Sequence, residues 1–212
     1  MSLIVLCAGG HASVVIEALR SGGISPMAAT DSNHFRKGDF LLGVPIIGSD
    51  DHVLSMAASE TQLVNGLGNR ASRTSSNLSN RRQLFDRFFV MGYAFPVVTH
   101  ASAIVASDAS TGAGSQIMAG AIIQPGVRIG CNVLVNTRAV VEHDCTVGDH
   151  SHIAPGSILC FGVTVGQEVH VGAGAIVLPQ VELGSGSVVA AGAVVARDLG
   201  PNSFIDRNLH ST

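Results

Sequence analysis

The densest group of side chains that could do acid–base chemistry lies between Glu142 and His152, where three of the nine histidines of the chain occur. His143 is followed directly by Asp144. A carboxylate beside an imidazole can accept a hydrogen bond from one ring nitrogen, which leaves the other nitrogen free to accept a proton. Histidine titrates near neutral pH, so a ring oriented in this way suits a general base. We therefore predict that His143 is a catalytic base and that Asp144 orients it.

A six-residue repeat in the second half of the chain determines where these side chains lie. Stepping by six from Thr99 to Val195, fifteen of seventeen positions hold Ile, Leu or Val. Four residues past each start, all sixteen positions from Ala103 to Ala193 hold Ala, Ser, Val or Cys. Six residues form one short strand and a corner, and three such units form a triangular coil that stacks its aliphatic side chains in a narrow core. The repeat predicts a parallel β-helix, without a long inserted loop, over residues 99–196.

The repeat also predicts the surroundings of individual histidines. His143 lies two residues after the inward position Val141, so its side chain is expected at the surface of the prism. His152 and His170 are eighteen residues apart, which is one full coil. These two side chains are therefore expected to stack on the same edge of the β-helix.

The first part of the chain has the pattern of an open α/β domain. An apolar run over 3–7 is followed by a turn with Gly9, Gly10 and His11 and by an amphipathic segment that ends near residue 20. A second short strand ends at Asp31 and a third ends in the segment 66–70, with helices expected over 50–58 and 76–91. The carboxyl ends of parallel strands share one edge of the sheet, where small ligands bind. We therefore predict a nucleotide site at the glycine turns, with Asp31 near a ribose.

Composition excludes several classes of function. With 12 Lys and Arg against 15 Asp and Glu, the formal net charge is −3, so no basic surface for nucleic acid is expected. No apolar run is long enough to span a bilayer and no secretory leader is evident, so the cytoplasm is the expected compartment. The cysteines have neither the spacing of a metal site nor that of a disulfide framework; they are Cys7, Cys131, Cys145 and Cys160.

Several short strings occur together along nearly the whole chain, at residues 8–12, 43–48, 66–70, 136–137, 141–145 and 151–156. They closely resemble the NeuD/PglD group of bacterial sugar O- and N-acyltransferases. The resemblance implies a left-handed β-helix and a homotrimer with active sites between neighbouring subunits. The expected fold is thus a Rossmann-like α/β domain with a small parallel sheet at residues 1–97, a left-handed parallel β-helix at 98–199, and a C-terminal tail at 200–212.

The resemblance also implies substrates and the roles of individual residues. The donor is acetyl-CoA, and the acceptor is a nucleotide-linked sugar, commonly a 4-amino-4,6-dideoxy sugar. His143 matches the catalytic base and Asp144 matches the carboxylate that orients it, and no metal is implied. The residues that match the acceptor site are Gly9, Gly10, His11, Asp31, Gly68, Asn69, Arg73 and Asn136. The residues that match the acetyl-CoA site are His152, Gly172, Ala173, Gly174, Ala191 and Arg197.

Three other functions stay open at this stage. An O-acetyltransferase of the sialic-acid type would use a hydroxyl acceptor, and the sequence does not separate GDP, UDP and dTDP as the nucleotide. The spacing of His143, His150 and His152 could supply three zinc ligands, as in the gamma-type carbonic anhydrases that share the prism. A non-catalytic sensor or scaffold would bind a sugar nucleotide without needing CoA. The α/β domain and Asp144 argue against the zinc enzyme, and the expected nucleotide site favours N-acetylation of a nucleotide-linked amino sugar.

Overall fold

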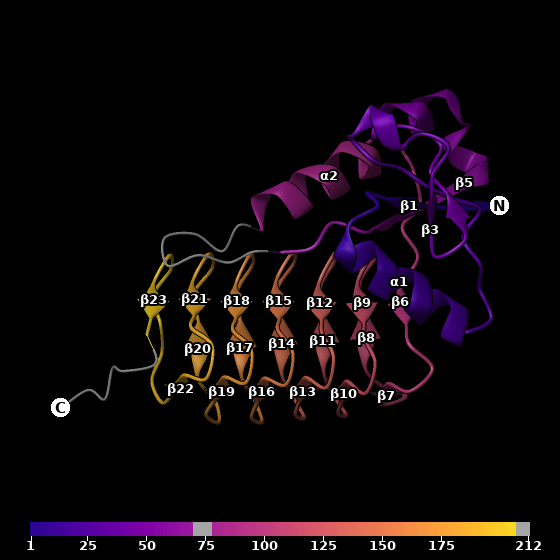
Figure 1. Ribbon diagram of the computed structural model, residues 1–212. Coiled ribbons are helices and arrows are strands. Elements are labelled where there is room, and N and C mark those ends of the chain that lie inside the picture. The colour runs from indigo at the N-terminus through magenta and orange to yellow at the C-terminus, as the bar shows by residue number, and fades with distance from the viewer. Residues whose placement is uncertain (70–77, 207–212) are drawn as a thin grey trace.

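A small α/β domain sits on one side of a long three-sided β-helix in the computed structural model, which describes residues 1–69 and 78–206 (Figure 1). The sheet of the α/β domain is parallel, in the order β2-β1-β5. Its strands are β1 (Ser2–Leu6), β2 (Ala28–Ala29) and β5 (Thr61–Asn65). Two α-helices, α1 (Gly10–Ser21) and α2 (Ser79–Phe89), accompany it. The predicted order of strand, glycine turn and helix is confirmed.

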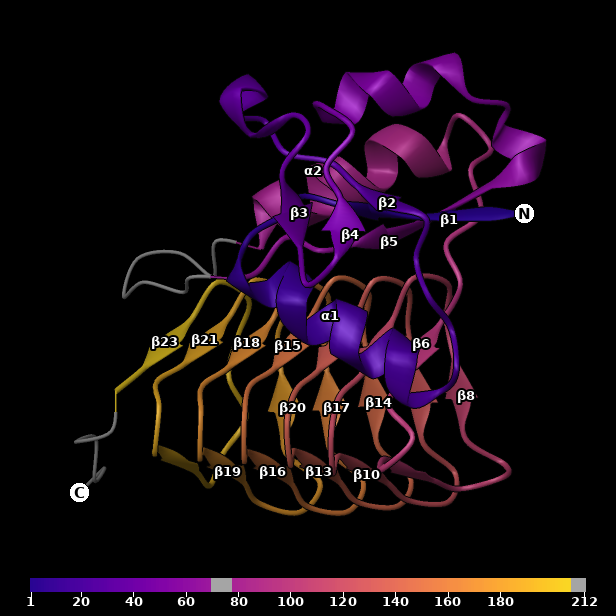
Figure 2. The same cartoon turned by 45° about the vertical axis from the view of Figure 1, so that its right-hand side comes forward.

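The two α-helices cover opposite faces of this sheet because alternate residues of β1 point to opposite sides. Leu3 and Val5 share a core with α1, whereas Ile4 and Leu6 share a core with Phe85 and Phe88 of α2. The core of α1 also includes residues of the β-helix, so this helix lies between the sheet and the prism (Figure 2); these residues are Val98, Met118 and Leu134. The carboxyl ends of β1 and β5 are thereby held directly over one face of the β-helix.

The segment between β2 and β5 differs from the prediction. A single helix was expected over 50–58, but the chain forms two 3₁₀ turns, η2 (Asp50–Ser55) and η3 (Ala58–Glu60). Met56 and Ala57 between them have extended backbone, which ends the helical hydrogen-bond ladder. Asp and Ser residues compete with the backbone for hydrogen bonds, which disfavours a longer helix. The remaining elements are η1 (His34–Arg36) and a hairpin of β3 (Phe40–Leu41) and β4 (Val44–Pro45).

The β-helix has three faces, each a parallel ladder of two-residue strands. The covered face, under the α/β domain, consists of β6 (Val98–Thr99), β9 (Gln116–Ile117), β12 (Leu134–Val135), β15 (His152–Ile153), β18 (His170–Val171), β21 (Val188–Val189) and β23 (Phe204–Ile205). The aliphatic face consists of β7 (Ile104–Val105), β10 (Ile122–Ile123), β13 (Val140–Val141), β16 (Ile158–Leu159), β19 (Ile176–Val177) and β22 (Val194–Val195). The polar face consists of β8 (Ser110–Thr111), β11 (Arg128–Ile129), β14 (Thr146–Val147), β17 (Thr164–Val165) and β20 (Glu182–Leu183).

From β9 onward, the second residue of each two-residue strand of the prism faces the narrow core, as the repeat predicts, and the first faces outward. The spacing of six holds from β6 to β22 without an inserted loop, which confirms the expected β-helix. The end of the helix is different. Val188 pairs with Phe204, whereas a strict repeat of eighteen would pair it with Asp206. The β-helix thus extends past residue 199, into the segment that was expected to be a tail.

Candidate active site

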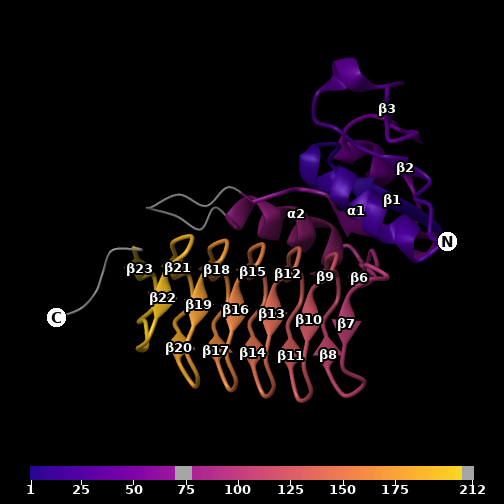
Figure 3. The same ribbon diagram turned by 60° about the horizontal axis from the view of Figure 1, so that its bottom comes forward.

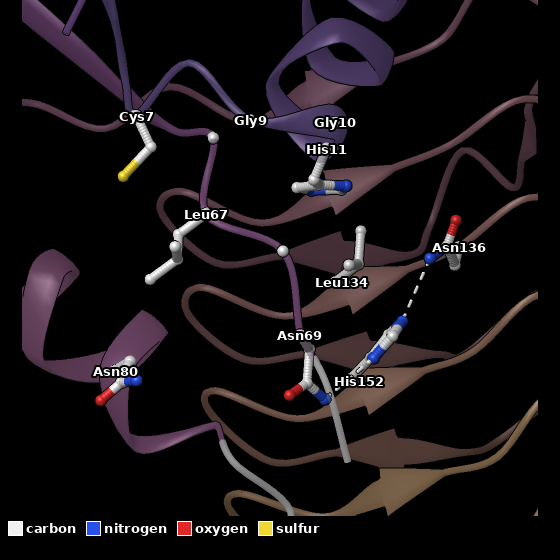
Figure 4. Close-up of a pocket in the computed structure, with 12 residues that line it drawn as sticks. Cys7, Gly9, Gly10, His11, Leu67, Asn69, Asn80, Leu134, Asn136 and His152 are labelled. Atoms are coloured by element: carbon white, nitrogen blue, oxygen red, sulfur yellow. Dashed lines mark hydrogen bonds between the residues drawn. The ribbon is translucent and has the colours of Figure 1, made fainter. Parts of the chain in front are cut away.

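A cavity of about 570 Å³ lies where the carboxyl ends of β1 and β5 meet the covered face (Figure 4). The α/β domain contributes its glycine turns, and the β-helix contributes the floor. The sequence-predicted acceptor residues that line it are Gly9, Gly10, His11, Gly68, Asn69 and Asn136, joined by His152. Cys7, Gly66 and Leu67 of the predicted glycine turns also line it, as do two residues that the sequence analysis did not assign to a site, Asn80 and Leu134. The structure therefore brings together most of the predicted acceptor site.

Tight backbone geometry shapes the upper wall of this cavity. Cys7 ends β1 with φ 72, in the left-handed region, and its N–H donates to the hydroxyl of Thr30 at 3.0 Å. Gly66 ends β5, and a Cβ there would lie 2.6 Å from the carbonyl oxygen of Leu6, so only glycine lets the two strand ends approach. α1 begins beside them at Gly10, where the first backbone N–H groups of a helix favour an anionic ligand.

Burial keeps the polar groups around the cavity in particular charge states. Burial, and secondly the charge of Arg81, lower the pKa of His11 to about 4, and its Nε2 lies 2.9 Å from Oε1 of Gln116. Arg81 itself is buried in α2 and donates to the carbonyl oxygens of Asn65 at 3.3 Å and Leu67 at 2.9 Å. Burial raises the pKa of Cys7 to about 12. This thiol is therefore protonated at neutral pH and is not a nucleophile.

The floor of the cavity carries a linked set of histidine and asparagine side chains. His152, only 6% exposed, lies with its Nε2 3.1 Å from Asn136 and its Nδ1 3.2 Å from Asn69 (Figure 4). The amide of Asn69 also reaches His170, and the two imidazole rings pack edge to face with centroids 4.9 Å apart. This confirms the predicted stacking of His152 and His170. Burial, with smaller effects of neighbouring charges on His152, lowers the pKa of both rings, to about 4 for His170.

The predicted catalytic pair lies elsewhere, at the corner between the aliphatic and polar faces. Nδ1 of His143 lies 2.8 Å from Oδ2 of Asp144, and the imidazole is 52% exposed, as expected for a surface base. Asp144 has φ 62, and Gly126 one coil earlier leaves room for its carboxylate, since a Cβ there would lie 2.6 Å from Oδ1 of Asp144. The ring of Phe161, one coil later, stacks on His143 with a centroid distance of 5.4 Å and an interplanar angle of 3°. The structure thus holds the imidazole of His143 between a carboxylate and an aromatic ring, but outside the cavity.

A second cavity of about 630 Å³ continues along the covered face towards the C-terminal end. It is lined by three of the predicted acetyl-CoA residues, Gly172, Ala173 and Ala191, and Asn69 belongs to both cavities. Gly174 lies at the same corner, with φ 65. Small side chains along this groove leave room for an extended ligand. His170 also lines it, a residue that the sequence analysis did not assign to a site.

Three of the predicted binding residues line neither cavity: Asp31, Gly174 and Arg197. Asp31 is engaged by Arg36, whose Nη1 lies 2.6 Å from its Oδ2, and it lines neither cavity. Arg197 is exposed and lines neither cavity. Arg73 lies outside the described residues.

The zinc alternative finds no support within one chain. Over residues 1–69 and 78–206, no group of three His, Cys, Asp or Glu side chains could hold a metal ion. His143 pairs with Asp144, whereas His150 lies against Asn132, with its Nδ1 at 3.1 Å from the amide. Neither α1 nor α2 has the length and apolar character needed to cross a membrane, and the described part of the chain has no other helix that does.

Two signals in the sequence could have located residues that were missed. Adding eighteen to His143 gives Phe161, so the stacked ring follows from the same repeat that placed His152 beside His170. Gln116 lies eighteen residues before Leu134 on the covered face, and it is a polar residue at an outward position that the α/β domain buries. Arg81 gives no such signal, since nothing in the sequence indicates that this cation of α2 is buried.

Comparison with known proteins assigns both halves of the chain. The PglD N-terminal domain matches residues 2–76, and the bacterial transferase hexapeptide (six repeats) matches residues 126–160 and 162–197. The search of curated proteins gave no match.

Solved structures extend the likeness to the whole chain. PerB from Caulobacter crescentus, solved with CoA and GDP-perosamine, is 33% identical, with 96% of this chain and 93% of that chain covered and a TM-score of 0.87. The acetyltransferase domain of PglB from Neisseria gonorrhoeae is 32% identical over 96% of this chain and 95% of that one, with a TM-score of 0.85. WeeI from Acinetobacter baumannii, at 20% identity over 96% and 95% of the two chains, shares the fold with a TM-score of 0.76. With both domains in this order and this similarity along its length, the chain belongs to the NeuD/PglD family of bacterial sugar acyltransferases.

Proposed function

We propose that this chain transfers the acetyl group of acetyl-CoA to the amino group of a nucleotide-linked 4-amino-4,6-dideoxy sugar, a precursor of a surface polysaccharide or glycan. The observation that carries the proposal is the cavity at the carboxyl ends of β1 and β5, floored by the β-helix. It occurs in a chain that is similar along 96% of its length to a Caulobacter protein solved with CoA and GDP-perosamine. The related Neisseria domain has been solved with acetyl coenzyme A.

The first cavity suits the nucleotide sugar. The N-terminus of α1, at Gly9 and Gly10, offers backbone N–H groups to phosphate oxygens. Gly68 and His11 border the same space, and Asn136 and His152 present polar atoms at its floor. Asp31 and Arg73 are proposed to complete the nucleotide end. The second cavity suits the pantetheine arm of acetyl-CoA, along Gly172, Ala173, Gly174 and Ala191, with Arg197 near the CoA phosphates.

The reaction that fits these groups is direct transfer. The amine lone pair attacks the thioester carbonyl, the carbon–sulfur bond breaks, and the sulfur leaves with its electron pair. Nε2 of His143 accepts the proton that the amine loses, since Nδ1 is directed at Asp144. That proton then neutralises the departing thiolate. A thioester is already activated, so no covalent enzyme intermediate is needed, and alignment of the two substrates supplies much of the rate.

We propose a homotrimer because one chain does not bring His143 to the cavity. The aliphatic face is bordered by the corner of Asn136 on one side and by the corner of His143 on the other. In a trimer whose axis runs beside this face, the Asn136 corner of one copy would lie against the His143 corner of the next copy. No described part of the α/β domain covers this face (Figure 3). Its outward residues are all aliphatic: Ile104, Ile122, Val140, Ile158, Ile176 and Val194. The polar face carries Ser, Arg, Thr and Glu at the same positions.

The assembly has its own test. Ile158→Arg places a charge in the middle of the aliphatic face, while Thr164→Arg places one on the polar face. We expect light scattering to show smaller species and activity to fall with Ile158→Arg only. Unchanged mass and turnover in Ile158→Arg would contradict an interface at this face.

The activity is tested with a panel of nucleotide-linked sugars and acetyl-CoA, followed by release of free CoA thiol. We expect turnover with a 4-amino-4,6-dideoxy sugar and little with the matching 4-hydroxy sugar. GDP, UDP and dTDP forms of the same sugar identify the nucleotide. Turnover with sialic acid or another hydroxyl acceptor alone would replace the proposal by O-acetylation.

The four cysteines are free thiols, in keeping with a reducing compartment, and we propose that the protein is located in the cytoplasm.

A further inference from the structure

Asn69 stands at the junction of the two cavities and is the side chain that lines both. Its Nδ2 lies 3.2 Å from Nδ1 of His152 and 3.1 Å from Nδ1 of His170. Its Oδ1 is buried and has no hydrogen-bond partner among the described residues. A buried amide oxygen without a donor is costly, so the arrangement calls for an explanation.

The proton positions on His152 follow from its other neighbour. The backbone N–H of Thr137 donates to Oδ1 of Asn136 at 2.8 Å, and a backbone N–H cannot act as an acceptor. The NH₂ group of Asn136 is therefore the one that faces Nε2 of His152, at 3.1 Å. An NH₂ group only donates, so Nε2 of His152 must be the bare, accepting nitrogen. A neutral imidazole carries one proton, and this proton must then be on Nδ1.

An N–H on Nδ1 of His152 cannot face the NH₂ group of Asn69, because both would be donors. A half-turn about the Cβ–Cγ bond of Asn69 exchanges its oxygen and nitrogen without moving the amide. Its oxygen then lies between the two Nδ1 atoms and can accept from both rings, using its two lone pairs. The half-turn removes the donor–donor conflict at His152 and gives the buried oxygen its partners at the same time.

We propose that Asn69 directs its amide oxygen to both rings, which fixes His152 and His170 as neutral Nδ1–H tautomers and leaves Nε2 of His170 as a hydrogen-bond acceptor in the second cavity. Asn69 is thus a positioning residue, and His170 is a further binding residue. The ligand group that His170 would accept from is an N–H, and among uncharged groups a secondary amide supplies it best. On the proposed function, that amide belongs to the pantetheine arm of acetyl-CoA.

The charges around the two rings agree with neutral imidazoles. Burial is the main reason why His152 disfavours a second proton on its ring, and the charge of Arg81, which faces it from α2, acts in the same direction. Burial lowers the pKa of His170 to about 4. Asp206 is the carboxylate among the residues that line the second cavity.

The tautomers can be measured directly by NMR on the full-length protein labelled with ¹⁵N in its imidazole rings. The two ring nitrogens of a neutral histidine resonate far apart, and His152→Gln and His170→Gln variants assign the signals. We expect Nδ1 to be the protonated nitrogen in both rings at pH 7. An Nε2–H tautomer at either ring would overturn the proposal. This experiment needs no substrate, so it can succeed even if the acetyltransferase activity fails.

Two isosteric variants of Asn69 test its positioning role. Asn69→Asp keeps an oxygen toward both rings, so the Nδ1–H tautomers should persist. Asn69→Leu removes the acceptor, so the His170 signals should move towards the Nε2–H form that free histidine favours. Unchanged tautomers in Asn69→Leu would show that the amide does not control them. Circular dichroism verifies that each variant is folded.

The role of His170 is tested by its affinity for the donor. His170→Phe keeps a planar ring and loses the acceptor, so the Kd for CoA should rise by roughly three- to ten-fold, the value of one hydrogen bond. His170→Gln, whose amide oxygen can accept, should recover part of the affinity. Calorimetry with CoA alone gives these values without turnover. An unchanged Kd in His170→Phe would remove His170 from the donor site, whatever the acceptor sugar proves to be.

Discussion

The corner that holds His143 and the wall that holds His152 and His170 are built from the same six-residue unit, yet they treat the imidazole differently. His143 is half exposed and lies beside a carboxylate. His152 is 6% exposed and lies between two amides. A carboxylate stabilises the imidazolium that forms when the ring takes a proton, whereas buried amides favour the neutral ring. The fold sets where each histidine lies. The side chains next to that histidine determine whether its ring can accept a proton or stays neutral and only forms hydrogen bonds.

The largest expected effect comes from removing the ring that can carry a proton. His143→Ala should lower kcat by roughly 10²–10⁴-fold, the usual contribution of a positioned general base, while CoA and the sugar nucleotide still bind. The measurement is steady-state release of CoA thiol together with calorimetric binding. His100→Ala, at a corner of the first coil, is the matched control and should retain wild-type kcat. A His143→Ala variant with wild-type kcat would show that the imidazole at this corner does not accept the proton in the reaction.

The second effect concerns the rings that stay neutral. Burial lowers the pKa of His170 to about 4, whereas an unfolded histidine titrates near 6.5. Between these values the unfolded chain binds a proton that the folded chain does not, so the free energy of unfolding falls as the pH falls. From pH 7 to pH 5, His170 should account for a loss of about 2 kcal/mol. The free energy of unfolding of His170→Gln, measured with denaturant, should therefore fall by about 2 kcal/mol less than that of the wild type between pH 7 and pH 5. If both proteins lost the same free energy, the ring of His170 would not be held neutral in the folded chain.

The positions of these histidines on the β-helix could be predicted from the sequence, because they follow from the six-residue repeat. Parallel pairing at a spacing of eighteen is imposed by the backbone, so the stacking of His152 on His170 follows from their numbers alone. The exposed position of His143 follows in the same way from its distance to Val141. The repeat fails only at its end, where β23 pairs two residues earlier than a strict repeat requires.

The other part of the site depends on side-chain contacts of the α/β domain, and the repeat contains no information about them. Arg81 is a charged residue in a helix with exposed neighbours, and it is buried completely against the carbonyl oxygens of Asn65 and Leu67 of its own domain. Asp31 likewise pairs with Arg36, five residues later, a contact that its place after a strand does not reveal. Such contacts come from side chains that reach across loops, where no periodic pattern applies.

The smallest effect should come from the ring that supports His143 from the next coil. Phe161 stacks on the imidazole with an interplanar angle of 3°, and aromatic pairs of this kind are worth about 0.5–1.5 kcal/mol beyond burial. Without it, the exposed imidazole samples more rotamers, so Phe161→Ala should lower kcat by roughly three- to ten-fold with little change in KM. Phe161→Tyr keeps the ring and should restore kcat. If Phe161→Tyr were as slow as Phe161→Ala, stacking would not be the reason, and the carboxylate of Asp144 alone would orient the base.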